Sequence, residues 1–298
     1  MSDLEEKGFL FHPHTSAGRV PTNKAYRLFV DQLLALPAIV TPESGRMTEE
    51  LTTGGSAIEA ILRRAAQTLG VLTQELGVAV GPRLGRSVLR RLELVRVSTE
   101  RLLMVLSLDG GVVRTVFVEV DGEIADSAVA QVTAVLNERL AGLNLDQIRS
   151  SLGVRLRDTA AGPGASELLN IFLQEGEQLF DAVLPLGEEN VLLGHASLLA
   201  EQPEFSEADR MRRLLALTER PDALADAIRR RTAPGVTITI GTEHSDPRLD
   251  EFTVVTAEYH VGTLNGVIGV IGPTRMPYEK VISLVSHTSR LLNDLLHQ

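Results

Sequence analysis

The sequence has no cysteine and no long apolar segment, and both absences narrow what the protein can be. Without cysteine there can be no disulfide, thiolate zinc site, iron–sulfur cluster or cysteine nucleophile. No apolar run approaches the roughly 20 residues that cross a bilayer, and the acidic N-terminus lacks the basic flank of a signal peptide. These features predict a cytoplasmic protein that makes no membrane contact.

The composition is typical of a soluble globular protein of two or three domains, with 298 residues, 44% hydrophobic and 23% charged. The net charge of −10 hides opposed regions. Residues 61–101 carry eight arginines against three acids, a balance of +5, and residues 102–210 carry six basic against eighteen acidic side chains, a balance of −12. The basic stretch is either a solvated helix face with a turn or an electrostatic surface for phosphate or a partner.

Hydrophobic periodicity predicts alternating helical and extended regions. Thr22 is expected to cap a helix over residues 22–36, which Pro37 ends, and residues 37–55 are predicted to be a linker. Further helices are predicted at residues 56–76, 124–136 and 206–217 and from Pro277 onward, and strands at residues 92–97, 102–108, 112–120, 236–240, 252–259 and 264–271. Strands on either side of a helical block favour an α+β fold in which one antiparallel sheet is interrupted by an inserted subdomain.

The usual catalytic and cofactor motifs are missing, so we predict no enzyme, no cofactor and no metal. Residues 81–87 (GPRLGRS) resemble a phosphate loop, but the spacing is one residue short and arginine replaces lysine. Gly266, Gly269 and Gly272 lie in a strand pattern, where close packing explains them better than a dinucleotide fingerprint.

The isolated histidines are predicted to have no metal-binding or catalytic role. His12 and His14 have no third metal ligand of clear spacing, so they are predicted to be surface loop residues. His195 lies in an apolar run and is predicted to be a core residue rather than a catalytic base.

Two ends of the chain resemble one family. Residues 3–10 (DLEEKGFL) and 14–22 (HTSAGRVPT), with Tyr26 and Arg27, resemble the wing region of HrcA, the heat-inducible transcription repressor family of bacteria. The C-terminal pattern agrees in residues 202–205 (QPEF), 254–257 (VVTA) and 269–278 (GVIGPTRMPY).

The resemblance implies a winged-helix DNA-binding domain, a GAF-like domain and a dimerising domain inserted into the latter. On this basis residues 1–40 are expected to be the C-terminal part of the winged helix, 41–120 with 200–298 the GAF-like domain, and 121–199 the inserted, mostly helical domain. It also implies a homodimer that represses chaperone operons from an inverted-repeat operator on double-stranded DNA, aided by the GroE chaperonin.

The resemblance begins within the winged helix, because members of the family carry roughly forty to fifty further residues ahead of this point. We therefore expect Met1 to be an internal methionine of a longer product. The alternative function is a dimerisation or interaction module that lacks specific DNA binding by itself.

Five side chains are candidates for DNA contact. Arg19 offers a fork of donors beside Gly18, and Thr15 and Ser16 could donate to phosphate oxygens. Lys24 and Arg27, one helical turn apart, could add non-specific attraction. The alternative is that residues 15–22 shape a hairpin and cap the next helix.

The acidic helical block is the candidate dimer interface. Its apolar stripes are Leu136, Leu140 and Leu143, or Leu168, Leu169 and Phe172. Each of these residues could equally belong to the core of its own domain.

Overall fold

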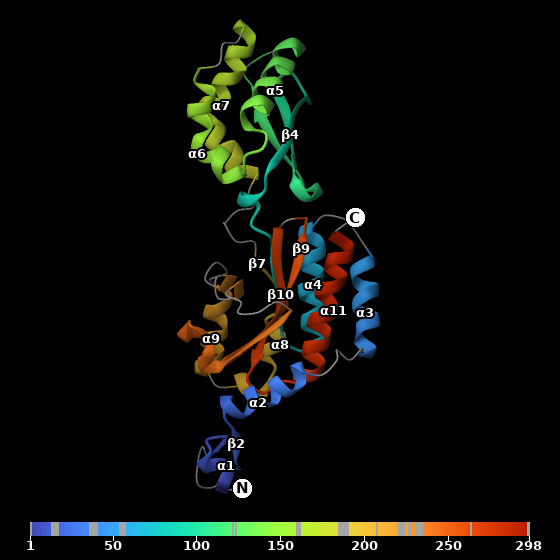
Figure 1. The fold of residues 1–298 in the computed structure, drawn as a ribbon, viewed down its shortest axis with the longest axis vertical. Coiled ribbons are helices and arrows are strands. Elements are labelled where there is room, and N and C mark those ends of the chain that lie inside the picture. Colours follow the sequence, from blue (N-terminus) through green and yellow to red (C-terminus); the bar gives the residue numbers. More distant parts are fainter. Residues whose placement is uncertain are drawn as a thin grey trace.

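The computed structural model has three parts, which follow one another along the long axis of the molecule (Figure 1). We call residues 2–35 the N-terminal unit, residues 41–83 with 191–296 the sheet unit, and residues 84–183 the inserted unit. The structure describes residues 2–12, 18–35, 41–53, 58–120, 122, 124–158, 162–183, 191–206, 208–219, 224–225, 228–229, 235–262 and 264–296. None of the helices within these ranges is both long and apolar enough to cross a membrane.

The N-terminal unit consists of α1 (Ser2–Glu6), β1 (Leu10–Phe11), β2 (Val20–Pro21) and α2 (Asn23–Leu34). The two short strands pair antiparallel, with Leu10 opposite Pro21. Thr22 caps α2, and its hydroxyl accepts a hydrogen bond from the amide of Ala25 at 3.4 Å. The predicted helix and its cap are therefore confirmed.

The sheet unit is built on one antiparallel five-stranded sheet in the order β7-β3-β10-β9-β8. The strands are β3 (Leu76–Val80), β7 (Val191–Leu193), β8 (Val236–Ile240), β9 (Phe252–Val261) and β10 (Leu264–Pro273). Residues 236–240, 252–259 and 264–271 were predicted as strands and are strands. The continuous burial of β3 removed the alternation by which periodicity identifies a strand.

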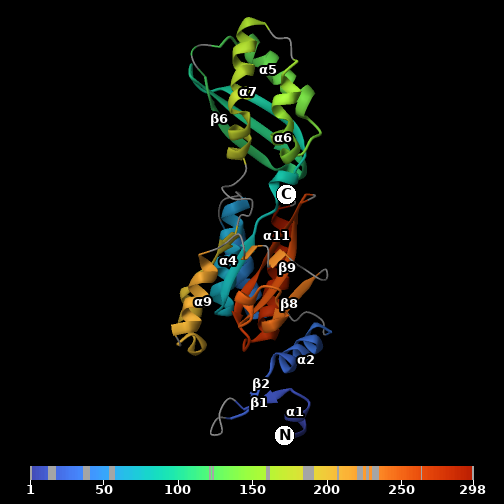
Figure 2. The ribbon, with the colours of Figure 1, turned by 90° about the vertical axis from the view of Figure 1, so that its left-hand side faces the viewer.

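Helices cover both faces of this sheet (Figures 1 and 2). One face carries α3 (Pro42–Thr52), α4 (Ile58–Thr73) and α11 (Tyr278–Leu296), and the other carries α8 (Ser197–Ala200), the short 3-10 helix η3 (Pro203–Phe205) and α9 (Ala208–Thr218). Successive residues of β9 alternate between the two cores, since Val254 packs on the α9 side and Val255 on the α4 side. The sheet is consequently buried on both faces.

The predicted linker over residues 37–55 is wrong in part, because α3 occupies Pro42–Thr52. Proline is well tolerated at the start of a helix, and Pro42 stands there. Met47 and Leu51 are buried in the shared core. With so few apolar residues among proline, glycine, serine and threonine, the helical period could not be recognised.

The inserted unit leaves the sheet unit after β3 and returns at β7. Its strands β4 (Leu89–Arg96), β5 (Arg101–Leu108) and β6 (Val113–Glu119) form a separate three-stranded sheet. Helices α5 (Asp126–Leu140), α6 (Leu145–Leu156) and α7 (Pro163–Val183) cover one face of it. The expectation that the strands before and after the helical block share one sheet is wrong for residues 89–119, because these strands pair only with one another.

The leucine stripes predicted as a dimer interface lie in the core of the inserted unit. Leu136, Leu140 and Leu168 are fully buried, and Leu169 and Phe172 are nearly so. The apolar faces of these helices pack against their own sheet. The prediction of an interface through these five residues is therefore wrong. Leu143 packs against the same core.

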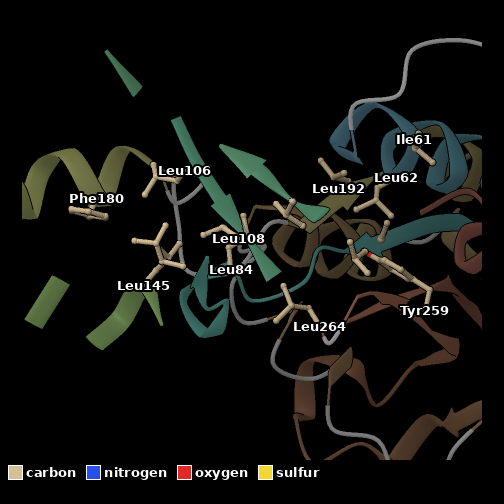
Figure 3. Packing of buried hydrophobic residues seen from close by; sticks show 14 of the residues in the cluster. Ile61, Leu62, Leu84, Leu106, Leu108, Leu145, Phe180, Leu192, Tyr259 and Leu264 are labelled. Carbon is tan, nitrogen blue, oxygen red and sulfur yellow. The ribbon is translucent and has the colours of Figure 1, made fainter. Parts of the chain in front are cut away.

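The apolar core continues across the junction between the sheet unit and the inserted unit (Figure 3). Leu84, Leu108 and Leu264 lie between the two sheets and belong to one cluster of buried residues. The backbones also meet there, since a side chain on Gly110 or Gly262 would overlap the other glycine. Both residues have positive φ, 70° and 59°.

Two predictions about isolated residues had opposite outcomes. Close packing at the strand glycines is confirmed, because a Cβ on Gly266 would overlap the Tyr259 ring and one on Gly269 the Val255 carbonyl. His195 is exposed rather than buried. It follows β7 at the edge of the sheet, where the apolar run leaves the core.

Candidate nucleic-acid interface

The β1–β2 hairpin is fastened to both helices of the N-terminal unit. After α1 the chain turns at Gly8, whose φ is 73° and whose amide donates to the Glu5 carbonyl at 2.9 Å. The Thr22 hydroxyl then donates to the Gly8 carbonyl at 2.7 Å. This turn therefore fixes the start of α2 against the end of α1.

Arg19, the leading candidate for DNA contact, lies on the arm of the hairpin before β2. Its Nε donates to Glu5 Oε1 at 2.8 Å, and His12 Nε2 lies 2.8 Å from the same oxygen. Hydrogen bonding from Arg19 lowers the pKa of the Glu5 carboxyl. Glu5, which the sequence did not single out, thus gathers two basic side chains at the base of the hairpin.

Lys24 lies beside the same hairpin on the first turn of α2. Its Nζ donates to the Lys7 carbonyl at 2.8 Å and stands over the Phe9 ring, 4.8 Å from the centroid. The ammonium group is on the surface, where it can still attract phosphate. Arg19 is consequently held by α1, and Lys24 by the segment between α1 and β1.

Arg27 points to a different part of the molecule. Its Nε donates to Glu243 Oε1 at 2.7 Å, and its Nη2 donates to the other oxygen of Glu243 and to the Ile238 carbonyl at 2.7 Å. Asp31 adds a longer contact at 3.4 Å. Arg27 therefore ties α2 to β8 and to the short helix η4 (Gly241–Glu243) that follows it.

The Arg27–Glu243 pair is half-buried, with side-chain exposures of 28% and 34%. Burial raises the pKa of Glu243, but hydrogen bonding from Arg27 and from the Ile240 amide outweighs it, so the pKa is lowered. The pKa of Arg27 is raised, chiefly by its hydrogen bond to Glu243. Both groups are charged at neutral pH.

Two predicted contacts, Thr15 and Ser16, lie outside the described residues, as does His14. The structure thus places Arg19 and Lys24 together on the N-terminal unit and Arg27 apart from them. Among the described residues, no group of three histidine, aspartate or glutamate side chains could hold a metal ion.

A family model for the HrcA protein C terminal domain matches residues 59–282 of the chain. The chain belongs to the HrcA family. Several relatives carry the name heat-inducible transcription repressor HrcA. Those of Chlorobium chlorochromatii strain CaD3 and Geobacter sulfurreducens are 34% and 36% identical over 301 and 299 residues, which are 99% of this chain and 85% of each relative. That of Chlorobium phaeobacteroides strain BS1 is 36% identical, over 99% of this chain and 86% of its own.

The fold of this HrcA family member also matches a solved structure. A crystal structure of a hypothetical protein superposes with a TM-score of 0.66 at 19% sequence identity, over 100% of this chain and 85% of the other. At that identity the likeness concerns the fold, which is mixed helix and sheet.

Proposed function

We propose that the chain is a heat-inducible transcription repressor that binds an inverted-repeat operator as a homodimer. The observation that carries this proposal is the extent of the similarity: relatives named as such repressors align with 99% of the chain, the hairpin region included. The cytoplasm is the compartment that this function requires. No catalytic step, cofactor or metal is needed.

The three parts of the molecule receive distinct roles in this proposal. Residues 1–40 are the C-terminal part of a winged-helix domain, and the sheet unit is a GAF-like domain. The inserted dimerising domain takes the borders of the separate sheet and its helices, residues 84–183, in place of 121–199. This division follows the pairing of the strands rather than their order along the chain.

Arg19 and Lys24, with Thr15 and Ser16, are the proposed phosphate contacts of the wing. Contact with DNA requires Arg19 to exchange Glu5 for a phosphate oxygen, which preserves a charge-assisted hydrogen bond. Arg27 contributes indirectly, since its bonds to Glu243 and Ile238 hold α2 and fix the direction of the hairpin.

The open face of the three-stranded sheet is the proposed dimer surface. Val95, Leu103 and Phe117 lie side by side across its three strands, and Val95 and Phe117 are 46% and 55% exposed. Two residues along β5 and β6 from this row, Arg101 pairs with Glu119 at 3.4 Å. A second copy related by a two-fold axis would present the same apolar row and both signs of charge, as an isologous interface requires.

Light scattering after size exclusion tests this surface. Phe117→Ser is expected to convert a dimer to a monomer, whereas Val154→Ser, on the 71% exposed side chain of α6, leaves the dimer intact. A dimer that survives Phe117→Ser at micromolar concentration would place the interface elsewhere.

Operator binding is tested with duplexes that carry the inverted repeats upstream of chaperone operons and with scrambled duplexes of equal length. Preferential binding of the inverted repeat by the dimer supports the repressor. A dimer that binds both duplexes equally weakly supports the alternative, an interaction module without specific DNA binding by itself.

The GroE chaperonin is the proposed modulator. Addition of purified chaperonin is expected to raise the fraction of chain that is competent to bind the operator. An unchanged active fraction at every chaperonin concentration would remove this part of the proposal.

A further inference from the structure

A pocket of about 320 Å³ opens at the junction between the sheet unit and the inserted unit. Its lining includes three arginines, Arg83, Arg86 and Arg229, and one acid, Glu258. Three positive charges against one negative charge leave an excess of two. A pocket of this size with this charge suits a small anion-bearing ligand.

The charged side chains converge on the pocket from separate parts of the chain. Arg83 precedes the short helix η1 (Leu84–Arg86), and Arg86 ends it. Glu258 is on β9, and Asn265 lies diagonally across from it on β10, where its amide donates to Glu258 at 3.3 Å. The basic stretch and the glycine-containing segment 81–87, which fit no known phosphate loop, supply two of the three arginines.

The backbone around the arginines is held firmly. Arg229 donates to the Gly81 carbonyl, and the Tyr259 hydroxyl donates to the neighbouring Val80 carbonyl at 3.1 Å. On the other side of η1 the Leu145 amide donates to the Ser87 carbonyl at 3.1 Å. Because the backbone on both sides of η1 is fixed, Arg83 and Arg86 have only their side-chain rotamers to order when they bind an anion.

Within the inserted unit, η1 is packed closely against α6. A side chain on Gly85 would overlap the carboxylate of Asp146, in the first turn of α6. Arg86 therefore belongs to the inserted unit and Arg83 directly precedes it, whereas Glu258 and Asn265 belong to the central sheet. The pocket spans the boundary between two bodies.

We propose that this pocket binds a small phosphorylated molecule that also carries hydroxyl or amino groups, such as a nucleotide. The arginines bind the phosphate oxygens, for which the guanidinium fork is well shaped. Glu258 accepts a hydrogen bond from a hydroxyl or amino group of the ligand, and Asn265 can donate or accept. The ligand joins the inserted unit to the sheet unit, so it restricts their relative rotation about the Gly110–Gly262 contact.

Isothermal titration of the full chain with ATP and with inorganic pyrophosphate, both free of divalent cations, tests the site. Arg86→Gln is expected to weaken both ligands by about tenfold, since one charge-assisted contact is lost. Arg86 is exposed, so the fold should survive the change. Arg90→Gln, on an exposed arginine of β4 outside the pocket lining, is the matched control and should leave both affinities unchanged.

Glu258→Gln provides a second test, in which the affinity for pyrophosphate is expected to rise rather than fall. Removal of the carboxylate charge takes away a repulsion, so pyrophosphate should bind the variant more tightly than the parent chain. ATP is expected to bind the parent chain more tightly than pyrophosphate, because only ATP reaches Glu258 and Asn265 with hydroxyl and amino groups.

Three results would overturn the proposal. The first is the absence of binding by either probe at millimolar concentration. The second is an equal loss in Arg86→Gln and Arg90→Gln, which would show diffuse attraction to a basic surface. The third is equal affinity for ATP and pyrophosphate, which would remove the role given to Glu258 and Asn265.

Discussion

The N-terminal unit and the sheet unit are held together by different forces. Among the described residues 2–35, Val30 is the only fully buried side chain, and large apolar side chains such as Phe11 and Leu28 are 47% and 51% exposed. In the sheet unit, β9 and β10 are buried along almost their whole length. Hydrophobic burial therefore stabilises the sheet unit, and α2 joins its core through Val30, whereas hydrogen bonds and ion pairs organise the hairpin and α1.

The two units also differ in how their carboxyl groups respond to pH. The pKa of Glu5 and that of Glu243 are lowered, so both carboxylates favour the folded arrangement in their charged form. The pKa of Glu75, at the start of β3, is raised to about 8, mainly by burial. Acidification should consequently weaken the contributions of Glu5 and Glu243, whereas protonation of Glu75 favours the folded sheet unit.

The largest expected effect is on the buried core of the sheet unit. Leu69 on α4 is fully buried, and Leu69→Ala should lower the free energy of unfolding by about 2–5 kcal/mol, through lost burial and the cavity that remains. Leu28→Ala on the exposed face of α2 should change it by less than about 0.5 kcal/mol. Urea unfolding followed by circular dichroism measures both. Equal losses would show that the Leu28 side chain is packed as tightly as that of Leu69.

The next effect concerns the buried carboxyl of Glu75, which is 2% exposed and whose Oε2 lies 3.3 Å from the Gln202 amide nitrogen. Between pH 4.5 and 8 the unfolded chain releases this proton and the folded chain keeps it. The free energy of unfolding should therefore fall as pH rises through this window, by up to about 1.4 kcal/mol per pH unit.

Glu75→Gln should abolish this slope and raise stability at pH 8, whereas Glu177→Gln on the exposed surface of α7 should leave the slope in place. Urea titrations at pH 5, 6.5 and 8 compare the three chains. Equal pH dependence in the parent chain and in Glu75→Gln would contradict the assignment of a protonated Glu75.

The C-terminal half of the sheet unit was visible in the sequence, whereas β3, β7 and α3 of the same unit were not. Alternating residues predicted β8, β9 and β10, and the apolar stripe from Pro277 predicted α11. The same patterns could not tell which strands share a sheet, because β4–β6 alternate in the same way. Nor could they distinguish a domain core from a partner surface, as the buried Leu136 and Leu168 show.

The candidate site was visible in part only. Resemblance and local spacing pointed to Arg19 and Lys24, and the Thr22 cap followed from its position before a helical stripe. The partner of Arg27, Glu243, is 216 residues away in the chain, and no local pattern reports such a contact. The sequence did not indicate the burial of Glu75 either, because an isolated acidic residue is usually exposed.

A smaller effect is expected at the junction between the two compared units. Arg27→Ala removes the hydrogen bonds to Glu243 and Ile238, which should weaken the docking of α2 on β8 by about 1 kcal/mol at this partly solvent-screened site. Hydrogen exchange of the α2 amides measures the docking. Asp31→Ala, which removes only the 3.4 Å contact, should have less effect.

The same pair should give the docking of α2 its pH dependence. Because the pKa of Glu243 is lowered in the folded chain, its contribution is present above about pH 4.5 and is lost as pH falls through the lowered value. Protection of the α2 amides should therefore decrease on acidification in the parent chain and change little in Arg27→Ala. Equal pH dependence in both chains would mean that Glu243 does not hold α2.

Arg19→Ala is expected to have the smallest effect on the free energy of unfolding and the most specific effect on the affinity for operator DNA. Arg19 and Glu5 form a pair on the hairpin whose side chains are 33% and 26% exposed and are screened by solvent, so the free energy of unfolding should be almost unchanged. If Arg19 contacts a phosphate, the variant should bind operator more weakly, and the slope of log affinity against log salt should decrease by about one. Glu5→Gln, which frees Arg19 from its carboxylate, should shift binding in the opposite direction. Identical salt slopes for the parent chain and Arg19→Ala would show that Arg19 serves only to shape the hairpin.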